Sequence, residues 1–418
     1  MTSFSTLGAL TGLAIGILLI ILKSPPFYGL IVGAILGGLL GGGSLAATIA
    51  AMTEGTQSMA SPILLILTSG ALVGAVIKTG ATDKIADTIV RTFGTSHALS
   101  AIAIATTFIC VAGVFVDIAF IAVAPVALAV GRKTNLNKES VLMAMLGGGK
   151  AGNLISPNPS TIAAAEAFDV ELTSLIIKSF IPALAALIVT IFFAYLLSLK
   201  KSGQVIRSSD LEGMADRLPT FLQSIAGPVV TIGLLASRPL FGWQIDPIIA
   251  LPVGGLVCIF ATGRWRDIIE ITSFGLKKVS KVAILFVGTG AVAGIVKASA
   301  FQHDFVTLLE SADIFAFMIA PLSGLAFAGA TASTTAGATL AAQTFSGTLL
   351  EQGVSGVYAA AMVNAGATAL NSLPHGAFFL ASAHATYMSF TKRVRLIPFE
   401  ACVGLTSTLA VTLLYLFS

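Results

Sequence analysis

The sequence predicts an all-α polytopic membrane protein with two inverted-topology repeats, and three observations predict it. First, 56% of the 418 residues are apolar and 10% are charged, with a mean hydropathy of +0.96, whereas a soluble domain is about 25% charged. Second, long stretches lack Lys, Arg, Asp and Glu, among them 24–53, 314–350 and 352–391. Third, short motifs recur in the two halves at nearly constant spacing. A water-soluble globular protein is therefore excluded.

Continuous apolar runs such as Ala185–Leu199 favour membrane helices, which need about 20 apolar residues, over the alternating strands of a barrel. Charged clusters mark the loops between the runs. Crossings are expected near 7–22, 27–50, 62–79, 98–130, 172–199, 218–237, 247–262, 282–298, 313–346 and 398–417. The stretches 140–170 and 354–390 contain Pro, Asn and Gly near their middles, so each is expected to form a re-entrant hairpin.

The two halves of the chain resemble each other. Ser69–Gly74 matches Thr289–Gly294 at an offset of 220 residues, and Pro157–Pro159 matches Pro374–Gly376 at 217. The predicted division is a first repeat over 1–199, a cytoplasmic linker over 200–217 and a second repeat over 218–418. Each repeat would hold about five crossings and one hairpin, and an odd number of crossings inverts the second repeat.

Basic residues indicate the orientation in an inner (plasma) membrane. With the N-terminus outside, fifteen of the 23 Lys and Arg residues would face the cytoplasm, as the positive-inside rule requires. Arg132, Lys133, Lys138 and Arg238 would lie outside, against the rule.

Polar residues gather at the two interrupted segments. Broken helices leave backbone groups unpaired at membrane depth, which is tolerated where they line a cavity or meet a ligand. Helix N-termini suit a carboxylate. A hydroxyl run at 331–335 also corresponds to the Asp117 region of the first half. The candidate substrate-binding residues are Lys150, Asn153, Ser156, Asn158, Ser160, Thr161, Thr331, Ser333, Thr334, Asn371, Ser372 and His375.

Two charged residues are expected inside the membrane, where charge is costly and usually functional. Asp117 is predicted to titrate or to bind the coupling ion, with His375 as a second proton-carrying group. Lys150 is predicted either to pair with Asp117 or to receive the substrate carboxylate. The alternative is an ion pair that stabilises the fold without a part in transport.

Several other classes of chemistry lack their motifs. Ala151 follows Lys150 where a Walker A loop needs Ser or Thr, and the G-x-G-x-x-G match at 147–152 has no βαβ context. There is no H-E-x-x-H or G-x-S-x-G motif, and the three cysteines have no metal-ligand spacing. The predictions are therefore no enzyme, no cofactor, no metal and no nucleic-acid partner. A homodimer is left open.

Three motifs carry a family resemblance: Gly113-x-Phe115-x-Asp117-x-x-Phe120 with Pro125, the Pro157-Asn158-Pro159 tip, and Asn371–Gly376. Together they resemble the gluconate permease family of the ion transporter superfamily. The resemblance implies a secondary carrier of small hydroxy-carboxylates such as gluconate, usually proton-coupled, with the two hairpins forming the substrate site. An elevator-like motion is also implied. The sequence departs from the family at Asn158, where a His-containing tip is common.

The leading hypothesis is a proton-coupled symporter of small organic acid anions. A sodium-coupled carboxylate carrier is the alternative, because carbonyl, Asn and Ser oxygens can also coordinate sodium. A passive channel and an intramembrane enzyme are the alternatives from other classes.

Overall fold

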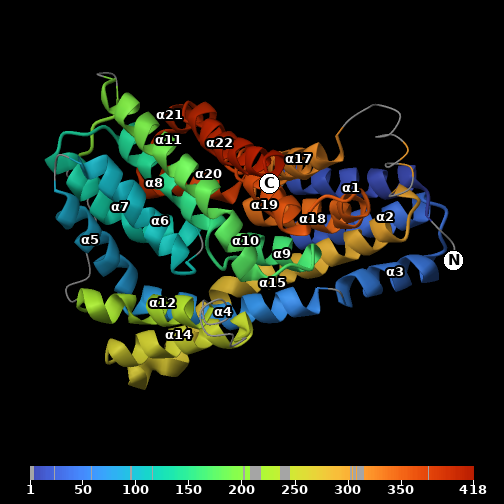
Figure 1. Cartoon of the computed structure of the whole chain (residues 1–418), viewed down its shortest axis with the longest axis horizontal. Coiled ribbons are helices and arrows are strands. Elements are labelled where there is room, and N and C mark those ends of the chain that lie inside the picture. The colour runs from blue at the N-terminus through green and yellow to red at the C-terminus, as the bar shows by residue number, and fades with distance from the viewer. Residues whose placement is uncertain are drawn as a thin grey trace.

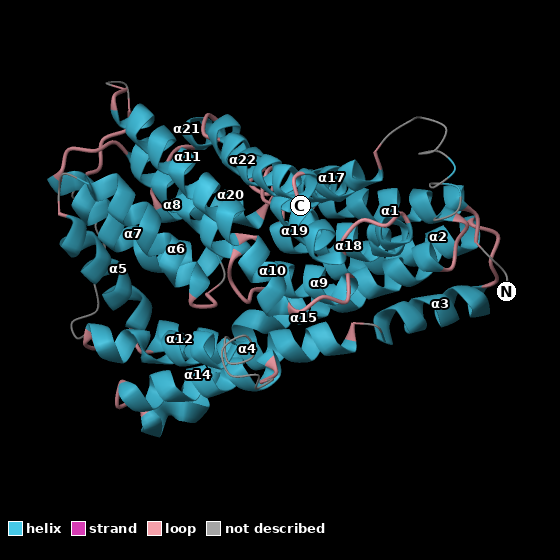
Figure 2. Ribbon diagram, viewed as in Figure 1, coloured by secondary structure: helices cyan, strands magenta, loops and turns pink. Residues whose placement is uncertain are grey.

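The computed structural model describes residues 4–22, 24–57, 59–94, 97–114, 116–200, 203–207, 218–235, 245–301, 304, 307, 315–374 and 376–418. Within these residues the secondary structure is helical and contains no strand (Figure 2). Long apolar segments adopt helices because each backbone N–H and C=O is then paired within its own segment. The all-helical part of the predicted fold class is therefore confirmed.

The first half contains α1 (Thr6–Ile21), α2 (Pro26–Leu40), α3 (Leu45–Gln57), α4 (Ala60–Lys78), α5 (Ala81–Phe93), α6 (Ala98–Val111), α7 (Val116–Lys133), α8 (Lys138–Leu154), α9 (Pro159–Ala167), α10 (Leu172–Lys178) and α11 (Phe180–Ser198). The second half contains α12 (Phe221–Leu235), α14 (Pro247–Ala261), α15 (Ile268–Lys297), α17 (Ile319–Thr331), α18 (Thr334–Glu351), α19 (Gly356–Ala367), α20 (Ala377–Ala385), α21 (Phe390–Val394) and α22 (Ile397–Leu416).

Among the described residues, three helical segments are long and apolar enough to cross a membrane: Phe180–Ser198, Trp265–Lys297 and Phe390–Leu416. A fourth candidate is Ile63–Lys78 with Ala81–Thr92, which bend by 59°. The other apolar helices, among them Thr6–Ile20, Pro26–Leu40 and Ala98–Val111, are 10–17 residues long.

The helices form two bundles (Figure 1). We call α1–α4, α12, α14 and α15 the glycine-rich bundle, and α6–α11 with α17–α22 the broken-helix bundle. Each bundle takes helices from both halves of the chain. In Figure 1, α4, α12 and α14 lie along the lower edge, and the helices of the broken-helix bundle lie above them. Helix α5 contacts both bundles.

Glycines allow close backbone contact in the glycine-rich bundle. A Cβ placed on Gly275 would lie 1.8 Å from Gly70 O, and one on Gly294 would lie 2.0 Å from Ala51 O. Any side chain at these positions would clash with a neighbouring helix. Small residues bring membrane helices together in this way, since lipid supplies no hydrophobic drive for helix association. The long helix α15 is held against α3 and α4 by such contacts.

The segment 98–133 is a helical hairpin, not the single crossing expected at 98–130. Gly148 of α8 packs on Ala103, and Gly152 on Thr107, so α6 runs in the same direction as α8. Gly149 packs on Val116 of α7, and Val141 of α8 packs on Gly131, so α7 runs in the opposite direction. The chain reverses between α6 and α7, where Gly113 has φ +91°, a conformation that glycine adopts without strain.

The segment 319–351 is a second helical hairpin and corrects the expected crossing at 313–346. Gly324 and Gly329 of α17 pack on Val363 and Leu370, so α17 runs along the direction of α19. Gly337 of α18 packs back on Ala328 of α17. The turn contains Ala332 with φ +47°. A run of apolar residues looks the same in sequence whether it is one helix or two antiparallel ones.

The hairpins expected at 140–170 and 354–390 are instead helices broken in the middle. Helix α8 ends at Leu154 and α9 begins at Pro159, and the two do not pack along each other. The same holds for α19 and α20, which flank residues 368–376. The Pro, Asn and Gly residues noted in the sequence thus mark breaks between successive helices.

The two broken helices start from opposite ends of the bundle. Asn137, before α8, donates to Leu197 O at the end of α11 (2.9 Å). Tyr358, near the start of α19, accepts from Lys178, just before α11 begins (3.2 Å). Matching elements are also evenly spaced, because both bounds of α18 lie 218 residues after those of α7, and both bounds of α20 lie 218 after those of α9.

Candidate functional site

The break between α8 and α9 is organised by Asn158, which caps the N-terminus of α9. Asn158 Oδ1 accepts from Ser160 N (2.9 Å), Thr161 N (3.2 Å) and Ser160 Oγ (2.6 Å). Its Nδ2 donates to Ser156 Oγ (2.8 Å) and Thr161 Oγ1 (3.0 Å). Asn is a preferred cap and Pro159 is suited to the first helical position. The Asn158 side-chain amide therefore provides an acceptor for two backbone N–H groups at the start of α9.

Asn153 completes this first polar cluster. Its Nδ2 donates to Ser160 Oγ (3.1 Å), and its backbone oxygen accepts from Thr161 Oγ1 (3.2 Å) and from Asn158 Nδ2. All five predicted residues of the first segment, Asn153, Ser156, Asn158, Ser160 and Thr161, are buried. The structure thus gathers them into one hydrogen-bonded network.

Lys150 lies at the centre of a second cluster. It is 2% exposed, and its Nζ donates to Thr368 O and to Asn371 Oδ1 (2.5 Å) in the break between α19 and α20. Asn371 Nδ2 donates to Thr334 Oγ1 (2.7 Å), and Ser372 Oγ donates to Asn371 Oδ1 (3.1 Å). A cation of the first half is therefore held by oxygens of the second half.

Asn364 makes the reciprocal contact and was missed by the sequence analysis. Its Nδ2 donates to Thr161 Oγ1 (3.3 Å), so a side chain of α19 contacts α9. In the same way, Lys150 of α8 contacts the break between α19 and α20. Asn364 Oδ1 is buried and has no hydrogen-bond partner among the described residues. An unpaired buried acceptor costs about 1–3 kcal/mol, so a ligand donor would be stabilised here. The sequence signal was an amide within the otherwise apolar 356–370 segment.

Thr331 and Ser333 shape the tip of the second hairpin. Thr331 Oγ1 donates to Phe327 O (2.7 Å), and Ser333 Oγ caps α18 by accepting from Ala336 N (3.3 Å). They have no direct hydrogen bond to the Lys150 cluster and adjoin it through Thr334. His375 lies outside the described residues. Asp117 is the second residue of α7, and its side chain is also outside the described set.

A buried ion pair was also missed. Arg393 and Glu400 are both 0% exposed, and each guanidinium NH₂ group contacts a carboxylate oxygen. Arg393 Nε donates to Ser382 Oγ (2.9 Å), and the guanidinium lies 4.7 Å from the Phe379 ring centroid. The sequence placed Arg393 in a loop between the expected segments 354–390 and 398–417, so its burial corrects that expectation. Opposite charges seven residues apart, beside an apolar run, were the available signal.

The start of α8 also corrects the expected membrane sides. Lys138 and Glu139 are buried, whereas a loop outside the membrane was expected. Lys138 Nζ donates to Tyr387 O (3.0 Å), and Glu139 Oε1 lies 3.5 Å from Lys392 Nζ. Residues 132–139 therefore share one end of the bundle with Lys200, although the prediction placed Lys138 outside and the linker that begins at Lys200 in the cytoplasm.

The opposite end carries carboxylates. A cavity of about 150 Å³ lies between the two bundles and is lined by Ser61, Glu166, Glu171 and Asp246, among others. Ser61 Oγ donates to Glu166 Oε1 (3.1 Å). Partial burial raises the pKa of Glu166, the hydrogen bond from Ser61 opposes this, and the charges of Asp246 and Asp169 add to it. Among the described residues no group of His, Cys, Asp or Glu could hold a metal ion.

The arrangement suits the binding of a small polar anion. Two buried clusters of amides and hydroxyls lie at the breaks of the two helices, and the second of them holds the buried Lys150 ammonium. Together with the membrane-length apolar helices, this arrangement is the kind expected of a multi-pass membrane transporter, a class that comparison with known proteins supports.

The chain belongs to the GntP permease family, since the GntP family permease model matches residues 6–418. A Haemophilus influenzae protein described as an uncharacterized transporter is 44% identical over 99% of both chains. The Gnt-II system L-idonate transporter of Escherichia coli K12 is 24% identical, over 78% of this chain and 80% of its own. The crystal structure of the Alcanivorax borkumensis YdaH transporter has a similar fold, with a TM-score of 0.67 at 15% identity, covering 89% of this chain and 88% of that one.

The predicted family is therefore confirmed, as is the prediction that the protein is a transporter and not an enzyme.

Proposed function

We propose that the protein is a secondary active transporter of the inner membrane that carries small organic acid anions, such as gluconate or other sugar and hydroxy acids, together with protons. The observation that carries this proposal is the buried Lys150 ammonium between the two broken helices. Among the described side chains no carboxylate lies within ion-pair distance of it. A substrate carboxylate would supply that charge through a charge-assisted hydrogen bond.

The groups around Lys150 suit a hydroxylated substrate. Asn371 accepts from the ammonium and also contacts Thr334 and Ser372. Asn364 Oδ1, which has no partner among the described residues, could accept from a substrate hydroxyl. A sugar acid carries one carboxylate and several hydroxyls, so both clusters would find partners on it. The similarity to an L-idonate transporter supports this substrate class.

We infer that proton coupling is favoured over sodium. Thr368 O and Asn371 Oδ1 are the carbonyl and amide oxygens that would coordinate sodium at a broken helix, and the Lys150 ammonium already engages both. Asp117 and His375 are the residues proposed to carry the proton. The sodium-coupled carrier is kept as the alternative that the experiment separates.

An inverted repeat with boundaries at 1–199, 200–217 and 218–418 is part of the proposal. The 218-residue spacing of matching helices and the opposite starting ends of α8 and α19 support it. The helix pairs α6–α7 and α17–α18 would be its re-entrant hairpins. In an elevator-like cycle the broken-helix bundle would move against the glycine-rich bundle.

Uptake into proteoliposomes tests the function. Labelled gluconate and L-idonate are offered under a proton gradient, a sodium gradient or neither, and uptake that follows the proton gradient is expected. Sodium-driven uptake would select the alternative, and uptake independent of both gradients would indicate a channel. Asp117→Asn is expected to abolish proton-driven uptake without loss of folded protein, and unchanged uptake would reject the role of Asp117.

A further inference from the structure

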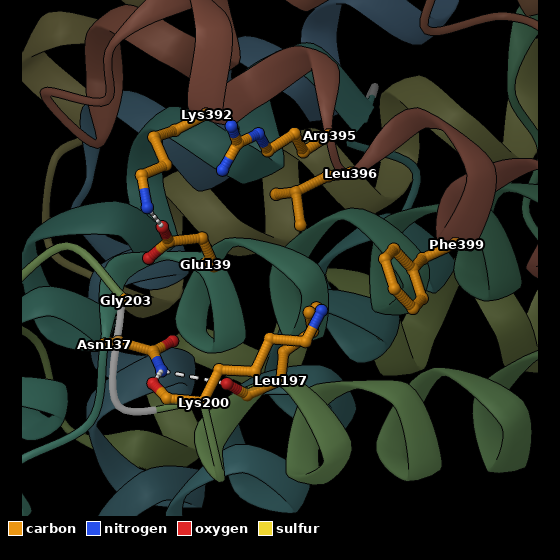
Figure 3. A pocket seen from close by; sticks show the side chains of 9 residues that line it. All are labelled: Asn137, Glu139, Leu197, Lys200, Gly203, Lys392, Arg395, Leu396 and Phe399. Carbon is orange, nitrogen blue, oxygen red and sulfur yellow. Dashed lines mark hydrogen bonds and ion pairs between the residues drawn. The ribbon is translucent and has the colours of Figure 1, made fainter.

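A cavity of about 110 Å³ lies at the end of the broken-helix bundle where α8 begins and α11 ends (Figure 3). Glu139 of α8 and Lys200, which follows the end of α11, line it together with Lys392, Arg395 and Phe399 of the second half. Figure 3 shows the Lys392 ammonium directed at Glu139, with Arg395 on the same side of the cavity. No part of the transport mechanism above uses this cavity.

The cavity carries more positive than negative charge. Its one acid, Glu139, is already engaged, since Oε1 lies 3.5 Å from Lys392 Nζ and Oε2 accepts from Gln204 N (2.7 Å). Lys200 Nζ lies 5.3 Å from the Phe399 ring centroid. Among the described residues, neither Lys200 nor Arg395 has a carboxylate within ion-pair distance. Within the described part of the chain, these two cations thus have no acidic partner.

The position of the cavity relates it to lipid. Helix α11 has membrane length and apolar composition, and it exposes large apolar side chains at helical spacing. One stripe of them consists of Phe180, Leu184, Ile188, Phe192, Leu196 and Leu199. The stripe ends directly before Lys200, and Leu197, Leu396 and Phe399 give the cavity an apolar wall. The cavity therefore lies where acyl chains give way to head groups.

We infer that this cavity binds the phosphate group of an anionic phospholipid. Lys200 and Arg395 would bind the phosphate oxygens, Arg395 through its bidentate guanidinium, while the apolar wall contacts the lipid backbone. Basic pockets between membrane helices are suited to acidic head groups. A phosphate held by both cations would bridge the end of α11 to the start of α22, joining the two halves of the chain. The inference depends on the membrane location and not on the proposed substrate.

Lipid titration of the purified full-length protein in neutral detergent tests the inference. Phosphatidylglycerol and phosphatidylcholine are added in parallel, and bound lipid is counted by native mass spectrometry. Phosphatidylglycerol is expected to bind more tightly than phosphatidylcholine. The double variant Lys200→Gln/Arg395→Gln is expected to bind phosphatidylglycerol about 25-fold more weakly, at about fivefold for each cation removed.

Matched controls keep the result specific. Lys277→Gln removes an exposed cation on α15 and is expected to leave the affinity unchanged. Lys200→Arg/Arg395→Lys conserves the charge and is expected to retain most of the affinity for phosphatidylglycerol. Arg395→Gln alone, at an exposed position, gives the same comparison if the double variant does not fold. Equal binding of both lipids, or full phosphatidylglycerol affinity in the double variant, would overturn the inference. Equally tight binding of glycerol 3-phosphate would overturn the lipid assignment.

Discussion

Replacing Lys150 by Met removes the ammonium while keeping a side chain of similar length and shape. Thr368 O loses its donor from Lys150, whereas Asn371 Oδ1 keeps the hydrogen bond from Ser372. One newly unpaired buried acceptor costs about 1–3 kcal/mol. The variant no longer buries a cation at 2% exposure, which offsets part of that cost. The net change in the free energy of unfolding is therefore expected to be within about 2 kcal/mol.

Binding should respond more strongly than stability. A hydrogen bond to a charged group contributes about 1.5–3 kcal/mol, which corresponds to a 10- to 150-fold weaker affinity for the anion. Lys150→Met should thus raise KM for gluconate uptake by at least tenfold in proteoliposomes, with thermal unfolding close to that of the parent. Lys277→Met is the matched control, because Lys277 is exposed on α15. An unchanged KM in folded Lys150→Met would refute the placement of the substrate at this ammonium.

Three further perturbations follow from the contacts. Asn158→Ala removes the α9 cap and is expected to lower stability by about 1–2 kcal/mol, measured by thermal unfolding. Glu400→Leu leaves the Arg393 guanidinium buried and unpaired, and should lower the free energy of unfolding by about 3–5 kcal/mol. The double variant Arg393→Met/Glu400→Leu should recover most of that lost stability. Because the pKa of Glu166 is raised, the folded state holds this proton more tightly than the unfolded state does. The parent should therefore lose stability relative to Glu166→Gln as pH rises above about 4.3.

Each of these has an outcome that contradicts it. Unfolding of Asn158→Ala at the parent temperature would show that the cap contributes nothing. A double variant at 393 and 400 that is no more stable than Glu400→Leu would show that the damage is not an unpaired charge. If the stability of the parent and that of Glu166→Gln changed by the same amount between pH 4 and 7, the result would contradict a raised pKa of the Glu166 carboxyl.

Membrane location and polar residues at the breaks were predictable because both depend on local cost. A charge or an unpaired backbone group in a bilayer is expensive wherever it falls. Scarcity of charge therefore marks the helices, and Pro and Asn mark the breaks. The network of Asn153, Ser156, Asn158, Ser160 and Thr161 lies within nine residues, so its members were certain to be neighbours.

The hairpins were misplaced because apolar content does not report chain direction. Residues 98–133 are apolar through most of their length, and the reversal depends on a left-handed Gly113 and on where Ala103 and Val116 pack on α8. That packing lies far along the chain and has no local signature. The same limit applies to Ala332 in the second hairpin.

By itself the sequence determined that this protein is a helical membrane protein, which segments are interrupted, and the family to which it belongs. Those properties follow from composition and from motifs a few residues long. The tertiary structure alone decided that Lys150 engages Thr368 and Asn371, that Arg393 is buried against Glu400, and that Glu139 shares a cavity with Lys200. The first and last of these contacts join residues 60 or more positions apart, and all of them depend on how whole helices pack.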